Sequence, residues 1–165
     1  MANLIPISTV VVGSGGAASI EFNSIPQTYT DLKIFLSGRT TAAAAYLALS
    51  YNGSTSNFSS RWLSGNGTTA GSFADTPRMA GTVVYSGWTA NTFSNHDIYI
   101  PNYTSSNYKS TSIDSVTEAN ATLSYAELTA SLYSSTSAIT SITLTTSSGN
   151  FAQYSTATLY GIRKY

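Results

Sequence analysis

His96 is the one histidine of this chain and the first place to look for chemistry. An imidazole has a usual pKa that suits proton transfer near neutral pH, but a hydrolytic site also needs a nucleophile within hydrogen-bond reach. The neighbouring carboxylate, Asp97, would point to the opposite face of a strand through these residues. The chain also lacks the G-x-S-x-G nucleophile elbow. We therefore predict a structural histidine, no catalytic residue, and a protein that is not an enzyme.

Metal and cofactor chemistry has little support in the sequence. The chain has no cysteine, and its carboxylates are scattered without the spacing of an EF-hand or a zinc site. A calcium ion held by Asp75 or by loop carbonyls is the open alternative. Segment 65–71 matches a glycine-rich nucleotide motif, but the following residues do not begin a helix, as that motif requires. We predict no metal, no cofactor, and a loop over 64–77.

Aromatic side chains are the residues best suited to bind a partner. The chain has twelve tyrosines, six phenylalanines and two tryptophans. Rings near loops can stack on sugars or pack in a protein interface, and packing in the core and at its rim is the competing interpretation. The candidate interface or glycan-contact aromatics are Trp62, Trp88, Tyr103 and Tyr108.

Short strands must position these residues. Alternating or β-branched runs recur between turn residues, and no segment has a capped helical period. The expected strands cover 4–12, 18–22, 31–37, 46–51, 57–63, 82–85, 96–100, 109–117, 122–133, 139–145 and 151–162. Asn52-Gly53 indicates a hairpin, with 57–63 as the return strand. The pattern predicts an all-β fold, a single antiparallel β-sandwich domain over residues 1–165, jelly-roll-like, with about 8–10 strands.

The stretch 151–162 has the most regular alternation, and we expect a strand held between two neighbours. Buried positions should be Phe151, Leu159 and Ile162, and Tyr160 should pack against a neighbouring strand. Replacing Ser155 by alanine should leave stability unchanged.

Charge is scarce and balanced. Charged residues are 8% of the chain, seven basic against seven acidic, compared with roughly 25% in an ordinary domain. Such a chain has no electrostatic footprint for nucleic acid or an anionic membrane, and near-zero net charge favours association. The first residues lack the basic and apolar regions of a secretory signal. We expect a self-associating protein, made in the cytoplasm without a signal peptide, that binds neither nucleic acid nor membrane.

Several strand and turn segments follow one another in a distinctive order. They are Asp31-Leu32, Leu49 to Gly53 followed by Asn57-Phe58, Ile100 to Tyr103 followed by Lys109, Ala138 to Leu144, Gly149 to Phe151, and Ser155 to Ile162. Together they resemble a family of small structural proteins of tailed bacteriophages, often those of aquatic bacteria, from about residue 20 onward. Family members often carry an acidic residue after the Asn-Gly turn, where this chain has Ser54, so a metal or polar contact at that turn loses support.

The resemblance implies a virion protein with a jelly-roll-like fold on the particle surface. The leading expectation is a capsid decoration (cement) protein, a homotrimer that binds the major capsid protein or other virion proteins and buries apolar surface across capsid subunits. The alternative is a tail-fibre or receptor-binding module that recognises a host surface glycan.

Overall fold

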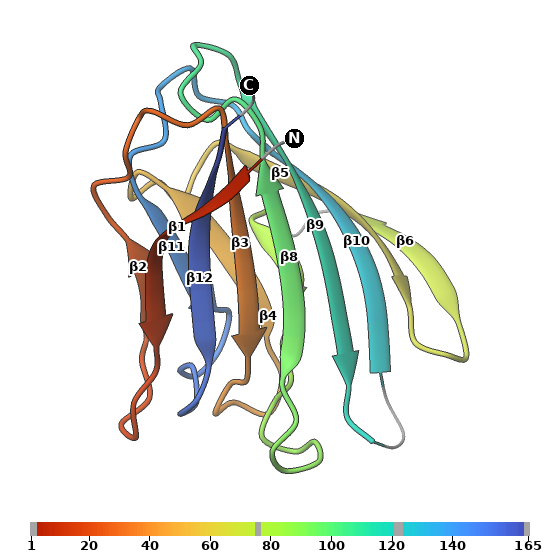
Figure 1. The fold of residues 1–165 in the computed structure, drawn as a ribbon. Helices are drawn as coiled ribbons and strands as arrows, with labels where there is room; N and C mark the ends of the chain where they lie inside the picture. The colour runs from red at the N-terminus through yellow and green to blue at the C-terminus, as the bar shows by residue number, and fades with distance from the viewer. Residues whose placement is uncertain (1–2, 75–76, 121–123, 164–165) are drawn as a thin grey trace.

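The computed structural model describes residues 3–74, 77–120 and 124–163 (Figure 1). This part of the chain contains twelve strands. The strands are β1 (Asn3–Val11), β2 (Ser19–Phe22), β3 (Asp31–Gly38), β4 (Tyr46–Tyr51), β5 (Phe58–Gly65), β6 (Ala70–Ala74), β7 (Met79–Thr82), β8 (Ser94–Ile100), β9 (Lys109–Glu118), β10 (Ser124–Tyr133), β11 (Ile142–Thr146) and β12 (Thr156–Arg163). Within these residues no helix is long and apolar enough to span a membrane. The all-β prediction is confirmed, with twelve strands in place of about 8–10.

The strands form two antiparallel sheets that pack as a sandwich. The large sheet has eight strands in the order β1-β12-β3-β8-β9-β10-β5-β6, and the small sheet has four in the order β2-β11-β4-β7. Figure 1 shows the large sheet in front of the small one, with β6 at the far right.

Eight of these strands have the connectivity of a jelly roll. With the two insertions described next left aside, β1, β3, β8 and β12 belong to the large sheet and β2, β4, β7 and β11 to the small one, which places β1-β12-β3-β8 opposite β2-β11-β4-β7. Two insertions supply the other four strands: β5 and β6 follow β4, and β9 and β10 follow β8. The inserted strands pair with one another and extend the large sheet beyond β8. We call β9, β10, β5 and β6 the wing.

Aliphatic side chains fill the space between the sheets in the jelly roll. Leu32, Ile34 and Leu36 alternate along β3 and are almost completely buried. They belong to one hydrophobic cluster with Leu49 and Leu144 of the small sheet. Burying each such side chain stabilises the fold by about 1.5–3 kcal/mol, so this cluster is the main source of stability.

β12 is central, as predicted, because it pairs with β1 on one side and β3 on the other. Leu159 is fully buried, and the Tyr160 ring packs edge-on against Phe35 of β3, with ring centroids 5.6 Å apart. Ile162 is only partly buried. The expected burial of the last strand is therefore confirmed for its inward face and holds in part for its outward face.

The strand does not begin at Phe151. Tyr154 has a positive φ of 71°, which interrupts the extended backbone, and β12 starts only at Thr156. Phe151 is fully buried and forms single bridges with Ala17 and Thr40. The predicted single strand over 151–162 is thus a buried bridge residue, a turn and a shorter strand.

Ser155 is not the indifferent position that the sequence suggested. It is fully buried, and its hydroxyl joins the backbone of Arg39 in both directions. The Arg39 N–H donates to Oγ at 3.1 Å, and Oγ donates to the Arg39 carbonyl at 3.2 Å. Alanine cannot make these bonds, so we expect Ser155→Ala to lower stability, contrary to the prediction from the sequence.

Asn52 and Gly53 form the predicted turn, but β5 does not return along β4. Both residues have positive φ, 53° and 70°, and Tyr51 and Ser54 form a bridge across the turn. The Asn52 Nδ2 donates to the Ala138 carbonyl at 2.8 Å, which ties the turn to the segment before β11. The chain then crosses to the large sheet, where β5 pairs with β10.

Segment 64–77, predicted as a loop, contains the end of β5 and all of β6. The glycine-rich stretch 65–71 is the hairpin tip between them. There the Asn66 Oδ1 accepts hydrogen bonds from the backbone N–H groups of Thr68 and Thr69, at 3.0 and 2.8 Å. Asp75, the residue considered as a calcium ligand, lies outside the described residues.

Candidate functional site

Polar side chains replace the aliphatic core where β7 crosses the wing. His96 of β8, Ser115 of β9 and Glu127 of β10 are register neighbours on the inner face of the large sheet, and all three are buried. We call them the polar row. Gly81 of β7 lies directly over it with a φ of +96°, and a Cβ there would come within 2.1 Å of the Ser115 Oγ. Only glycine allows β7 to approach the row this closely.

His96 holds β7 onto the sheet. Its Nδ1 lies 2.8 Å from the Ala80 carbonyl oxygen and its Nε2 lies 2.9 Å from the Ser94 Oγ. Burial lowers the pKa of the imidazole to about 4, although the bond to the Ala80 carbonyl opposes that shift. The ring is therefore neutral at neutral pH. As predicted, Asp97 lies on the opposite face, where it forms an ion pair with Lys33 at 2.9 Å.

Glu127 accepts four hydrogen bonds, two from Thr82 of β7 and two from serines of the wing, and so joins the wing to β7. Its Oε2 accepts from the Thr82 backbone N–H at 2.6 Å and from the Ser115 hydroxyl at 3.3 Å. Its Oε1 accepts from the hydroxyls of Thr82 and Ser64, at 3.1 and 3.3 Å. Among the residues that the structure describes, the ion pair between Lys33 and Asp97 stands alone, so neutral donors stabilise this buried carboxylate.

A groove of about 440 Å³ opens beside Glu127, between β7 and the β5–β6 hairpin. This volume falls within the roughly 300–1,000 Å³ of small-molecule sites. Five aromatic side chains line it, namely Tyr46, Trp62, Phe73, Tyr85 and Tyr125. The other lining residues include Ala44, Met79 and Ser147.

The rings form two stacks from distant parts of the chain. Trp62 of β5 and Phe73 of β6 are cross-strand neighbours, with ring centroids 5.5 Å apart and planes 21° from parallel. Trp88 stacks on Tyr125 at 6.1 Å and 18°, and packs against Tyr85 at 4.5 Å. The β5–β6 hairpin therefore supplies one wall, and the β7–β8 loop with the start of β10 supplies the other.

Arg39 holds the loop that carries Trp88. Its Nη1 donates to the carbonyls of Thr89 and Thr92 at 2.9 and 3.0 Å, and its Nη2 donates to the Trp88 carbonyl at 3.0 Å. The Thr89 hydroxyl also donates to the Ala119 carbonyl in the turn between β9 and β10. This loop is thus anchored from two sides, and the ring positions are set before any ligand arrives.

The structure brings together two of the four predicted aromatics. Trp62 lines the groove and Trp88 supports its second wall. Tyr103 is fully buried and its hydroxyl donates to the Pro26 carbonyl, so its ring offers no surface to a partner. Tyr108 is 58% exposed in the β8–β9 loop, at the end of the sandwich opposite the Trp88 loop (Figure 1).

Sequence reasoning missed four aromatic residues of the groove, namely Tyr46, Phe73, Tyr85 and Tyr125, and it also missed Glu127. The sequence of β10 contains a signal for two of them, Tyr125 and Glu127. In β10, Tyr125 and Glu127 share a parity with Thr129 and Ser131, while the opposite parity is Ala126, Leu128, Ala130 and Leu132. A strand with one wholly apolar face normally turns that face to the core.

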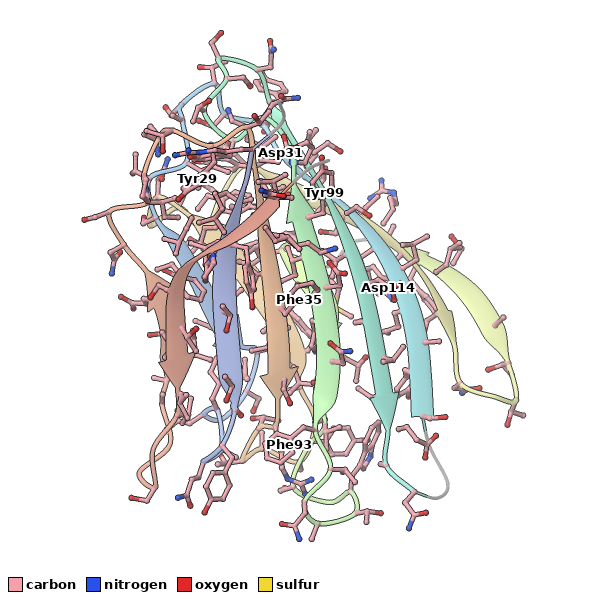
Figure 2. The ribbon with its side chains drawn as sticks, in the orientation of Figure 1. Tyr29, Asp31, Phe35, Phe93, Tyr99 and Asp114 are labelled. Atoms are coloured by element: carbon pink, nitrogen blue, oxygen red, sulfur yellow. The ribbon has the colours of Figure 1, made fainter. Side chains whose placement is uncertain are left out.

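β10 does the reverse. Thr129 and Ser131 are buried, whereas Leu128 is 53% and Leu132 is 36% exposed. Pairing with β9 and the hydrogen bonds of Glu127 to β7 fix this register. Large apolar side chains of the neighbouring strands join them, and we define the wing's outer face by Leu63, Val116, Leu128 and Leu132. Figure 2 looks onto this side of the large sheet, with Phe35 on the jelly roll and Asp114 on the wing.

Metal-ligating side chains do not gather in the described part of the chain. No three His, Asp or Glu residues there lie close enough to hold an ion together.

No protein-family description, curated protein or solved structure matches this chain. The groove and the wing's outer face are accordingly the two features from which a function can be inferred.

Proposed function

We propose that this chain is a non-enzymatic structural protein of a bacteriophage particle, a capsid decoration (cement) subunit that seats the wing's outer face on the capsid lattice. The resemblance to phage structural proteins and the near-absence of net charge support this role. The observation that carries it is the outward apolar face of β10, centred on Leu128.

An outward apolar face on a regular strand opposes the usual hydrophobic pattern. Leaving a leucine exposed forgoes about 1.5–3 kcal/mol of burial, and Leu63, Leu128 and Leu132 lie on the same outer face of adjoining strands. Arg61 and Asp114 flank them. An apolar centre with a polar rim is the composition of a protein interface.

The test is the position of the chain in purified particles, seen by electron microscopy. We expect density for the chain at every equivalent position of the head shell. Its presence only at the tail would overturn the decoration role in favour of receptor binding. Its absence from particles would overturn the virion assignment itself.

A binding experiment tests the surface. Purified chain is added to shells from which it is missing, as wild type, as Leu128→Ser, and as Val11→Ser, a control that changes another exposed apolar residue at the end of β1. We expect only Leu128→Ser to lose binding. If Leu128→Ser binds like the wild type, or instead dissociates a homo-oligomer in sedimentation, the outer face does not dock on the shell.

A tail-fibre or receptor-binding module is the second candidate, and the aromatic groove favours it. Such a module needs a preformed pocket with exposed rings, which a purely structural subunit does not require.

A further inference from the structure

The groove beside Glu127 combines ring faces with unused hydroxyl groups. Phe73 is 47% exposed, and Trp62, Tyr85 and Tyr125 are partly exposed, so their rings are accessible from the groove. A ring face carries negative charge density and attracts polarised C–H groups. Pyranose rings present such C–H groups on one face, which makes them suitable partners for these rings.

Three tyrosines line the groove, Tyr46, Tyr85 and Tyr125, and their hydroxyls have no hydrogen-bond partner among the described residues. Burial raises the pKa of Tyr125, and the nearby Tyr85 and Glu127 add to that shift, which indicates that these polar groups converge. Each phenol can donate and accept one or more hydrogen bonds. A ligand with several hydroxyl groups would therefore form hydrogen bonds with these tyrosine hydroxyls, whereas an aliphatic peptide segment would leave them unpaired.

Charge in the groove selects among such ligands. Glu127 is the one ionisable acid or base that lines it apart from the tyrosines, and its two oxygens already accept four hydrogen bonds. The lining contains no lysine, arginine or histidine. A carboxylated or sulfated sugar would find a negative charge and no cation, so the lining favours a neutral saccharide.

We propose that this groove is a binding site for a neutral saccharide, with the Trp62–Phe73 stack offering a ring face to one sugar ring and the hydroxyls of Tyr85 and Tyr125 bonding to it. The Arg39 bonds to the Trp88 loop hold the second wall in place, so little conformational entropy is lost on binding. This inference does not rest on the decoration role, because the wing's outer face and the groove lie on opposite sides of the wing.

Titration with neutral trisaccharides tests the site, using maltotriose, cellotriose and triacetylchitotriose, with sialyllactose as the anionic comparison. Tryptophan fluorescence and saturation-transfer NMR report binding to the full chain. We expect saturable binding of at least one neutral trisaccharide and none of sialyllactose. Trp62→Ala should weaken it about tenfold or more, the loss of one stacked ring.

Two further variants keep the outcome clear. Tyr108→Ala removes an exposed aromatic at the far end of the sandwich and should bind like the wild type. Tyr125→Phe removes one hydroxyl, keeps the stack with Trp88, and should weaken binding by a few-fold. Circular dichroism verifies that each variant is folded.

The proposal is overturned if no neutral trisaccharide binds, if sialyllactose binds as tightly, or if Trp62→Ala and Tyr108→Ala behave alike. It is also overturned if Trp62→Ala changes the oligomeric state in sedimentation while no sugar binds, because a second copy would then occupy the groove. Shell binding by Trp62→Ala should stay intact, which separates failure of this site from failure of the decoration role.

Discussion

The jelly roll and the wing belong to one continuous sheet but bury opposite kinds of side chain. In the jelly roll, Leu159 of β12 points inward and is fully buried beneath the second sheet. In the wing, Leu128 of β10 points outward and is 53% exposed, while its neighbour Glu127 points inward. The same alternation of residues therefore serves burial in one region and display in the other.

The two regions bury different side chains because different elements lie over them. The four-stranded sheet covers the jelly roll, where apolar contact between two sheets stabilises the fold. Over the wing the cover narrows to β7, which is held by hydrogen bonds to His96 and Glu127. The aliphatic core and the exposed apolar face therefore lie on different strands of one sheet.

The largest effect should follow from Leu159→Ala in the jelly roll. Truncating a fully buried leucine typically costs about 2–5 kcal/mol, because it leaves a cavity in the core. Chemical denaturation measures the free energy of unfolding. A loss no larger than that caused by Leu128→Ala would erase the distinction between the two regions.

Acid should weaken the junction between the two regions. Burial lowers the pKa of His96 to about 4 in the folded chain, against about 6.5 when unfolded, so the unfolded chain binds a proton more readily. The neutral imidazole therefore contributes to the free energy of unfolding above pH 6.5. This contribution, about 3 kcal/mol, is lost as the pH falls from 6.5 toward 4.

Unfolding of wild type and His96→Gln, compared at several pH values, isolates this contribution. His96→Gln should be less stable at pH 7 and should lose less stability on acidification. The other titratable groups are the same in both proteins, so their contributions cancel in the comparison. Parallel pH profiles would show that the imidazole is not held neutral at the junction.

Ser155→Ala should cost about 1–3 kcal/mol, the usual penalty for leaving a buried backbone group unpaired. The Arg39 N–H loses its acceptor, and the same residue holds the Trp88 loop. Thermal unfolding gives the stability change. As a control, Ser110→Ala changes an exposed serine of β9 and should be neutral.

The smallest effect on stability is expected for Leu128→Ser on the wing's outer face. Its side chain is already half in solvent, so the free energy of unfolding should change by no more than about 0.5 kcal/mol. A larger loss in denaturation would mean that the outer face contributes to the fold of the isolated chain and is not reserved for a partner.

Local patterns predicted most strands but not their partners. Strand β4 was predicted with its bounds, and β3, β8 and β9 nearly so. The turn at Asn52-Gly53 is also local and was correct. The pairing of β5 with β10 depends on residues far apart in the sequence, and a short-range signal carries no information about it. β6 was missed because Ala70–Ala74 is weakly apolar.

The groove was predictable only in part. Trp62 and Trp88 were chosen because aromatic rings near loops are common contact residues, but nothing local shows that they meet at one groove or that Tyr103 is buried. The inverted face of β10 is visible in the sequence. Which face of β10 turns inward could not be predicted, because it depends on hydrogen bonds between Glu127 and Thr82 of β7, a strand distant in the sequence.

The central place of β12 determines when the large sheet can be completed. β12 pairs with β1 and β3, so until residues 156–163 have been synthesised β1 lacks its sheet partner and β3 has only β8 beside it. Such distant pairings close slowly and leave strand edges open in the meantime. During synthesis, β1 and β3 are therefore exposed to pairing with other nascent chains. Pro6 and the register shift after it in β1 protect the first of these edges.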